Sequence, residues 1–163
     1  FHRKRRFMIK LQRMGHVLMA VRDVEVSQKF YMEILGFRLL EQDPEHGGVF
    51  LSIGSHGNTL DLFPSVEPEA TPPSASDARG MLGLGVKHVA FAVAEEGDLK
   101  AAYFALTEAG VPIQRALDHE SQKSIYFHDP DGNLLEIVWE RPDALDIFAK
   151  GRGDNDDEIS FER

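Results

Sequence analysis

The chain of 163 residues contains no cysteine. This absence excludes a disulfide framework, a thiolate-bound zinc or iron–sulfur site and a cysteine nucleophile. Long apolar runs are also missing, since no stretch of about 18 apolar residues is present to cross a bilayer. The start of the chain lacks the apolar segment of a secretory signal peptide. We therefore expect a cytoplasmic protein with no membrane partner.

Positive charge is in short supply. The chain has 18 Lys and Arg residues against 27 Asp and Glu residues, a net charge of -9. Because this is the wrong sign for a protein that neutralises phosphate backbones, we expect no nucleic-acid partner. The charge is also uneven, since residues 1–13 are basic and residues 153–163 are mostly acidic. Both ends are predicted to be solvated tails.

One structural unit occurs twice along the chain. The strand-like segment HVLMAV at residues 16–21 recurs as HVAFAV at residues 88–93. Each copy leads into a helical pattern that stops before a glycine, Gly36 or Gly110, and then into three strand-like segments. The sequence thus predicts an α+β fold in which two βαβββ modules form a curved mixed sheet.

The predicted boundaries follow from this duplication. The chain is long enough to bury a core without covalent crosslinks. Proline and serine between the two copies are typical of an exposed linker. The predicted segments are a basic tail at residues 1–13, the first module at 14–64, the linker at 65–85, the second module at 86–140, and a C-terminal extension with an acidic tail at 141–163.

Strand alternation predicts which polar side chains share a face. In the first strand of each module a histidine, His16 or His88, points away from the apolar residues that would face the helix. Asp61 and Glu136 hold matching places in the last strands and point to the same uncovered face. Pairing of the modules would gather two imidazoles and one or two carboxylates around a metal cavity. These nitrogen and oxygen ligands suit Fe(II), Mn(II), Ni(II) or Zn(II).

Residues 14–140 resemble the vicinal oxygen chelate superfamily, which includes glyoxalase I, extradiol dioxygenases, methylmalonyl-CoA epimerase and the fosfomycin and bleomycin resistance proteins. The motifs that carry the resemblance are GHV at 15–17, LGF at 35–37, KHVAF at 87–91 and YFHDPDGN at 126–133. The resemblance implies metal-assisted chemistry on a small molecule with vicinal oxygens. It also implies that His16, His88 and Glu136 bind the metal.

The segment from His119 to Glu136 is similar to the signature segment of extradiol dioxygenases. This resemblance implies Fe(II), a catecholic substrate, and His119 and Tyr126 beside the substrate. A catecholate that binds Fe(II) through both oxygens needs three protein ligands and open positions for itself and dioxygen. The chain departs from this family at Asn58, where an acid-catalysing histidine is usual. His56 lies two residues earlier.

Asp61 leaves other functions open. Glyoxalase I and its relatives have a fourth ligand, usually Glu or Gln, at this place, and such a site suits an isomerase or epimerase that moves a proton next to a carbonyl. Asp is shorter, so it either binds the metal or stops short of it. A metal-free small-molecule binding or resistance protein is a third alternative, against which the complete His, His and Glu set argues. The linker allows pairing within one chain or between chains, and we expect a homodimer.

Overall fold

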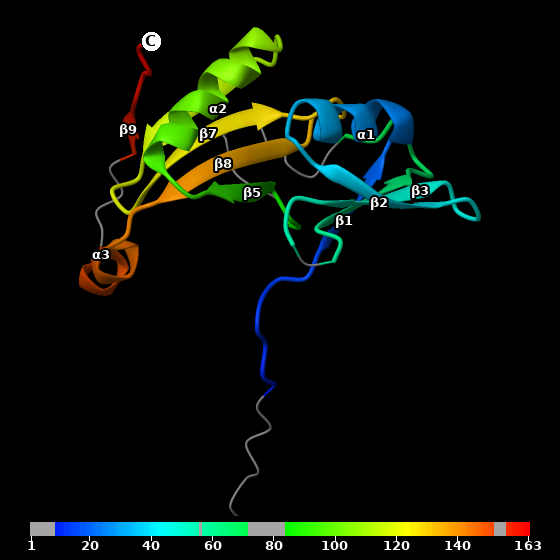
Figure 1. Cartoon of the computed structure of the whole chain (residues 1–163), viewed down its shortest axis with the longest axis horizontal. Coiled ribbons are helices and arrows are strands. Elements are labelled where there is room, and N and C mark those ends of the chain that lie inside the picture. Colours follow the sequence, from blue (N-terminus) through cyan, green and yellow to red (C-terminus); the bar gives the residue numbers. More distant parts are fainter. Residues whose placement is uncertain (1–8, 56, 72–83, 152–155) are drawn as a thin grey trace, which may run out of the picture.

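The computed structural model describes residues 9–55, 57–71, 84–151 and 156–163. Two modules lie next to each other, and both module helices cover the same side of the sheets (Figure 1). The first module consists of β1 (Val17–Val21), α1 (Val24–Glu33), β2 (Arg38–Asp43), β3 (Gly48–Ser52) and β4 (Leu60–Pro64). The second module consists of β5 (His88–Val93), α2 (Glu96–Glu108), β6 (Ile113–Asp118), β7 (Gln122–His128) and β8 (Leu134–Glu140). The chain continues with α3 (Ala144–Lys150) and β9 (Asp157–Glu158).

Each module forms its own mixed sheet. The strand order is β1-β4-β3-β2 in the first sheet and β5-β8-β7-β6-β9 in the second. The first and last strands of each module pair in parallel, β1 with β4 and β5 with β8, while the remaining pairs are antiparallel. The predicted α+β fold of two βαβββ modules is therefore confirmed.

Local sequence signals set the limits of both module helices. Asp23 caps α1, because its carboxylate accepts a hydrogen bond from the backbone N–H of Val26 at 3.1 Å. Glu95 and Asp98 form a capping box at the start of α2. Gly36 and Gly110 follow the two helices with φ of 76° and 74°, a conformation that glycine adopts without strain. The predicted stops at these two glycines are confirmed.

The core lies between the helices and the sheets, as strand alternation predicts. Its largest fully buried side chains come from both modules: Tyr31, Leu51, Leu60, Leu62, Leu99, Ile125, Phe127 and Leu135. Phe37 and Phe91 pack edge to face across the modules, with ring centroids 5.4 Å apart. Each such side chain contributes about 1.5–3 kcal/mol when fully buried, so apolar packing holds the helices on this side. The opposite side, which none of the described helices covers and which carries His16, Asp61, His88 and Glu136, is here called the open face.

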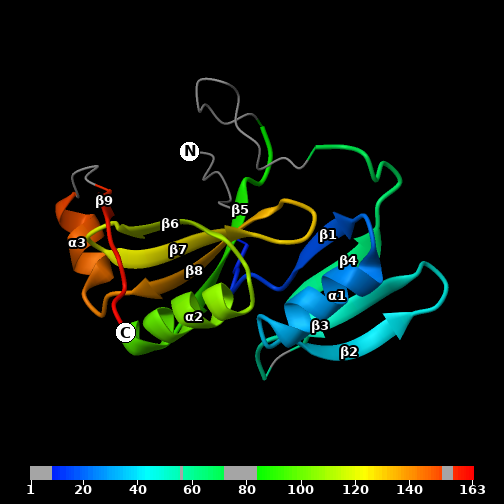
Figure 2. The same cartoon turned by 90° about the horizontal axis from the view of Figure 1, so that it is seen from above.

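Polar contacts also join the two modules. Arg22, just after β1, pairs with Asp131 in the β7–β8 turn at 3.0 Å. Tyr31 of α1 donates a hydrogen bond to Asp129 in the same turn at 2.9 Å. Figure 2 shows this turn beside β1 and α1. The contacts fix how one module sits against the other.

The C-terminal end differs from the solvated tail predicted from its charge. Within residues 156–163, β9 pairs with the edge of β6, although most side chains of this segment are exposed. The ring of Phe161 packs against Tyr103 with centroids 5.1 Å apart, and Arg163 pairs with Glu108. Apolar residues alternate with polar ones here, so Ile159 and Phe161 are partly buried on one face while the acidic side chains stay exposed.

Two other predicted segments extend beyond the described residues. Residues 1–8 of the basic tail and residues 72–83 of the linker lie outside the described part of the chain, as does His56. Where the basic tail is described, at residues 9–13, it is exposed. None of the helices in the described ranges is long and apolar enough to span a membrane.

Candidate functional site

The first module brings His16 and Asp61 together on the open face. His16 directly precedes β1, and Asp61 lies on β4, the strand that pairs with β1. Nε2 of His16 is 3.5 Å from Oδ2 of Asp61. The imidazole is half exposed, whereas the carboxylate is buried and accepts a hydrogen bond on Oδ1 from the amide of Asn58 at 2.5 Å. We call His16 and Asp61 the first half-site.

The second module repeats this arrangement with His88 and Glu136. His88 begins β5, and Glu136 lies on the paired strand β8. Nε2 of His88 is 3.0 Å from Oε2 of Glu136. Again the histidine is partly exposed and the carboxylate is buried, and Ser124 donates a hydrogen bond to Oε1 of Glu136. We call His88 and Glu136 the second half-site.

Each half-site has the spacing of two ligands on one metal ion. Ligand atoms about 2.1 Å from an ion lie about 3.0 Å apart at a right angle and about 3.4 Å apart at a tetrahedral angle. The measured separations, 3.0 and 3.5 Å, match these values. In each carboxylate a neutral donor holds one oxygen, and the second oxygen faces the histidine. The donor set therefore fits a divalent metal that accepts nitrogen and oxygen ligands.

The two half-sites remain separate within one chain. In the part of the chain that is described, no three His, Asp or Glu side chains gather closely enough to hold a metal ion. Residues of β1 and β5 line a common cavity of about 270 Å³, so the first strands of the modules face each other. The structure thus joins the four predicted ligands as two pairs, His16 with Asp61 and His88 with Glu136, and not as one cluster.

Tyr126 and His119 extend the second half-site. Tyr126 lies directly opposite Glu136 in the β7–β8 pairing, and its ring packs edge to face on His88 with centroids 5.9 Å apart. Nε2 of His119 is 3.0 Å from the Tyr126 hydroxyl. Burial, followed by the negative charge of Glu136, raises the pKa of Tyr126 to about 12. The tyrosine therefore carries its proton at neutral pH.

Three supporting residues were not predicted as such. Ser124 holds Glu136, and strand alternation could have found it, because it lies two residues from Tyr126 on the same face. Asn58, noted only as a departure from the dioxygenases, positions Asp61. Asp156 contacts Nδ1 of His119 at 2.6 Å. Nothing in the acidic C-terminal run distinguishes Asp156 from its neighbours.

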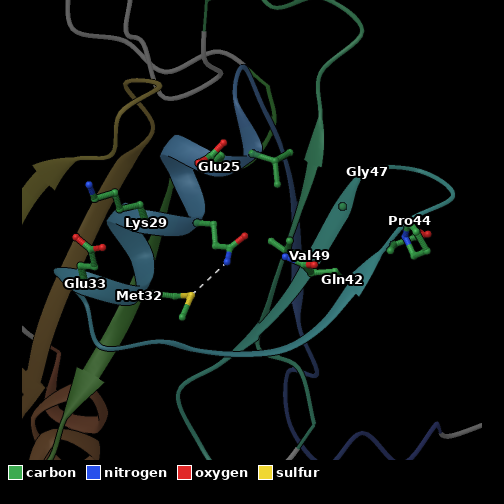
Figure 3. Close-up of a pocket in the computed structure, with 12 residues that line it drawn as sticks. Glu25, Lys29, Met32, Glu33, Gln42, Pro44, Gly47 and Val49 are labelled. Atoms are coloured by element: carbon green, nitrogen blue, oxygen red, sulfur yellow. Dashed lines mark hydrogen bonds between the residues drawn. The ribbon is translucent and has the colours of Figure 1, made fainter.

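A further cavity in the described part of the chain lies away from both half-sites. It is a groove of about 730 Å³ between α1 and the β2–β3 hairpin (Figure 3). Met32, Gln42 and Val49 line it, together with the acidic residues Glu25 and Glu33. None of the six predicted site residues does so. Because α1 lines the groove, it lies on the helix-covered side, whereas both half-sites lie on the open face.

Comparison with known proteins agrees with this geometry. Residues 13–137 match the family described as Glyoxalase/Bleomycin resistance protein/Dioxygenase superfamily. The chain is 26% identical over 140 residues to biphenyl-2,3-diol 1,2-dioxygenase 3 of Rhodococcus globerulus, covering 84% of this chain and 65% of that protein. It is 34% identical over 127 residues to glutathione transferase FosA of Serratia marcescens, covering 78% of this chain and 80% of that one. The chain thus spans less than two thirds of the length of the dioxygenase.

Solved structures show the same fold. The crystal structure of a glyoxylase/bleomycin resistance protein/dioxygenase domain from Frankia sp. EAN1pec superposes with a TM-score of 0.67. The alignment covers 82% of this chain and 95% of that one, at 21% sequence identity. At this identity the likeness concerns the arrangement of strands and helices, and the reaction has to be argued from the site.

Proposed function

The chain belongs to the Glyoxalase/Bleomycin resistance protein/Dioxygenase superfamily, and on that premise we propose that it is an Fe(II)-dependent dioxygenase that cleaves a catecholic ring in the extradiol manner. One observation carries the proposal: His119 and Tyr126 form a hydrogen-bonded pair directly beside the half-site of His88 and Glu136. An isomerase has no evident need for a protonated phenol and an imidazole in series next to its metal. A catechol has two hydroxyl protons that it can lose on binding a metal. A hydrogen-bonded tyrosine and histidine can accept such a proton and return it.

The residues that would hold Fe(II) are His16, His88 and Glu136. Bound there, the ion would supply Lewis-acid and redox chemistry toward a catechol and dioxygen. Two neutral imidazoles and one carboxylate leave open positions on such an ion. The half-exposed histidine rings face the open side of the sheets, from which a small substrate would arrive.

The chain's own proton chemistry rests on Tyr126 and His119. The Tyr126 hydroxyl keeps its proton at neutral pH. Because it donates that proton to His119, its oxygen is free to accept a hydrogen bond from a substrate hydroxyl. Nε2 of His119, 3.0 Å from that hydroxyl, accepts the proton when the substrate deprotonates and returns it later. Asn58 donates to Asp61 and has no proton to transfer, so the acid role passes to His119.

The substrate's aromatic character has support in the first module. Phe50 lies opposite Asp61 in the β3–β4 pairing, so the two side chains share the open face. Phe63, two residues after Asp61 on the same strand, packs edge to face on Phe50 with centroids 5.8 Å apart. This pair offers an apolar surface beside the first half-site, against which a planar ring can pack.

We place the complete metal centre between two copies of the chain. The support is the separation of the half-sites within one chain, since three ligands have to converge for tight metal binding. In a two-fold dimer, His16 of one copy would meet His88 and Glu136 of the other, twice over. Both histidines are partly exposed in a single chain, as expected if the second chain of the dimer completes each site.

A metal-dependent isomerase is the second candidate, and Asp61 favours it. The pairing of Asp61 with His16 mirrors that of Glu136 with His88, so Asp61 is placed as a fourth ligand would be. A four-ligand site suits proton transfer next to a carbonyl. The similarity to glyoxylase I 4 of Arabidopsis thaliana, 27% identical over 132 residues, points the same way.

Anaerobic reconstitution with Fe(II) tests the dioxygenase. Addition of simple and aryl-substituted catechols in air should give oxygen uptake and a yellow ring-fission product, whereas zinc should give neither. Tyr126→Phe should lower the rate on the order of 100-fold, within the range for loss of a proton-transfer group. His46→Ala is the matched control, because His46 is an exposed histidine in the β2–β3 turn paired with Asp43. If no catechol is turned over and the protein with Ni(II) or Co(II) isomerises a methylglyoxal–thiol adduct, the protein is an isomerase and not a dioxygenase.

A further inference from the structure

The C-terminal segment delivers one carboxylate to the candidate site. Asp156 directly precedes β9, which pairs with the end of β6 through Leu117 and Asp118. His119 directly follows β6, so the pairing brings Asp156 alongside it. Oδ1 of Asp156 lies 2.6 Å from Nδ1 of His119. The short distance is that of a charge-assisted hydrogen bond.

Further contacts hold this segment in place. The backbone N–H of Ile159 donates to the carbonyl of Ala116 at 3.0 Å. Phe161 packs against Tyr103 of α2, and Arg163 pairs with Glu108 at the end of the same helix. Arg115, which lines the cavity beside His119, pairs with Glu158 at 3.6 Å, so its charge is directed to the segment as well. The carboxylate of Asp156 is therefore carried on an anchored strand.

The contact with Asp156 decides which nitrogen of His119 carries the proton. An ionised carboxylate only accepts hydrogen bonds, so Nδ1 has to be the donor. In a neutral imidazole the other nitrogen, Nε2, is then the acceptor. Nε2 is the atom that lies 3.0 Å from the Tyr126 hydroxyl. The tyrosine thus donates to His119, and His119 donates to Asp156.

We propose that Asp156 is a positioning residue that fixes the ring orientation and the Nδ1–H tautomer of His119. The three side chains then form a relay from Tyr126, beside the second half-site, to a carboxylate that is 46% exposed to solvent. His119 itself is buried, with 8% of its surface exposed, so its ring depends on fixed partners and not on water. The C-terminal extension is thereby part of the site. Its acidic composition alone does not predict this role.

The proposal deepens the proposed function and rests on it only for the use of the relay in catalysis. The tautomer belongs to the chain alone, so the metal-free full-length protein can report it. In a nitrogen-15 spectrum of histidine-labelled protein, His119 should show a protonated Nδ1 with a strongly downfield proton and an acceptor-type Nε2. In Asp156→Ala the Nε2–H tautomer, which free imidazole side chains favour in water, should become the major form.

Asp157→Ala is the matched control, because it removes the same side chain from the next position on the same strand. It should leave the His119 signals unchanged. An unchanged tautomer in Asp156→Ala, or an equal change in Asp157→Ala, would overturn the proposal. With the reconstituted enzyme, Asp156→Ala should lower kcat on the order of tenfold with KM within about twofold. If the tautomer shifts as stated but no catechol is turned over, the relay stands and the dioxygenase fails.

Discussion

The hydroxyl of Tyr31 donates a hydrogen bond to Oδ2 of Asp129 at 2.9 Å and so joins the helix of the first module to a turn of the second. Both residues are buried. Asp129 also accepts hydrogen bonds from the backbone N–H groups of Asp131 and Asn133, which shape the β7–β8 turn. One carboxylate therefore organises a turn and holds it against α1, and this holds the half-sites at their separation.

Tyr31→Phe should lower the free energy of unfolding by about 1–3 kcal/mol, because it leaves a buried carboxylate oxygen with one hydrogen bond fewer. Chemical denaturation at neutral pH measures this. Tyr103→Phe provides the control, since Tyr103 holds the matching place on α2 and makes its aromatic contacts, with Phe104 and Phe161, through its ring. Equal stability of the two variants would show that the contact between the modules contributes nothing.

Alkaline pH should weaken the same contact. Burial, together with the negative charge of Asp129, raises the pKa of Tyr31 well above its ordinary value of 10.0. Below pH 10 the tyrosine is protonated in both the folded and the unfolded chain, so its contribution is constant. Above pH 10 only the unfolded chain loses the proton, and stability should fall by up to about 1.4 kcal/mol per pH unit for this group.

Unfolding measurements from pH 8 to pH 11 should therefore give a steeper alkaline decline in the wild-type protein than in Tyr31→Phe. Tyr126, whose pKa is also raised, is present in both proteins and cancels in the comparison. Parallel pH profiles for the two proteins would contradict the prediction.

The spacing and alternation of residues in the sequence account for most of the fold and for the strand face on which the candidate ligands lie. The histidine and carboxylate of each module share a strand pair and a face, and local alternation predicted the shared face. It did not predict that the four side chains form two separate pairs. The capped helices and their glycine stops are equally local. Such features depend on neighbours along the chain or on adjacent strands.

Contacts between distant segments were not predictable in this way. Tyr31 and Asp129 are 98 residues apart, and no periodicity relates a helix of one module to a turn of the other. Asp156 reaches His119 only because β9 extends the second sheet, which the acidic composition of residues 153–163 obscures. How the half-sites combine depends on the way the modules pack against each other. Alternation within a strand does not determine that packing.

Asp61 should remain outside the metal coordination if the dioxygenase proposal is right. Its side chain is one methylene shorter than the Glu found in four-ligand sites, so its carboxylate lies closer to the backbone of β4. A crystal structure of the Fe(II)-loaded protein should show both carboxylate oxygens farther from the ion than the coordination range of about 2.0–2.2 Å. A distance within that range would favour the isomerase.

Asp61→Glu offers the complementary measurement. The added methylene should carry a carboxylate oxygen to the ion, so metal affinity should rise and catechol turnover should fall as an open position is lost. A variant with unchanged turnover would indicate that the first half-site does not adjoin the substrate positions on the metal.

Mixing of two inactive variants should reveal whether two chains share the metal centre. His16→Ala and His88→Ala should each lose at least about tenfold in metal affinity, because each removes a ligand from every site. In a shared dimer, a mixed pair of these chains places both alanines in one site and leaves the other site intact. Denaturing the two variants together and refolding them should therefore restore metal to about a quarter of the wild-type sites, since half of the dimers are mixed and each has one intact site of two.

His88→Ala mixed with Glu136→Ala is the control for this experiment. Both changes fall on the second half-site, so a mixed dimer has one defect in each of its sites and no recovery is expected. If the modules instead pair within one chain, every chain carries its own defect and neither mixture should recover metal. Recovery of metal binding in the first mixture alone requires that His16 of one chain completes the site formed by His88 and Glu136 of the other. Recovery in neither mixture would show that each chain forms its own metal centre.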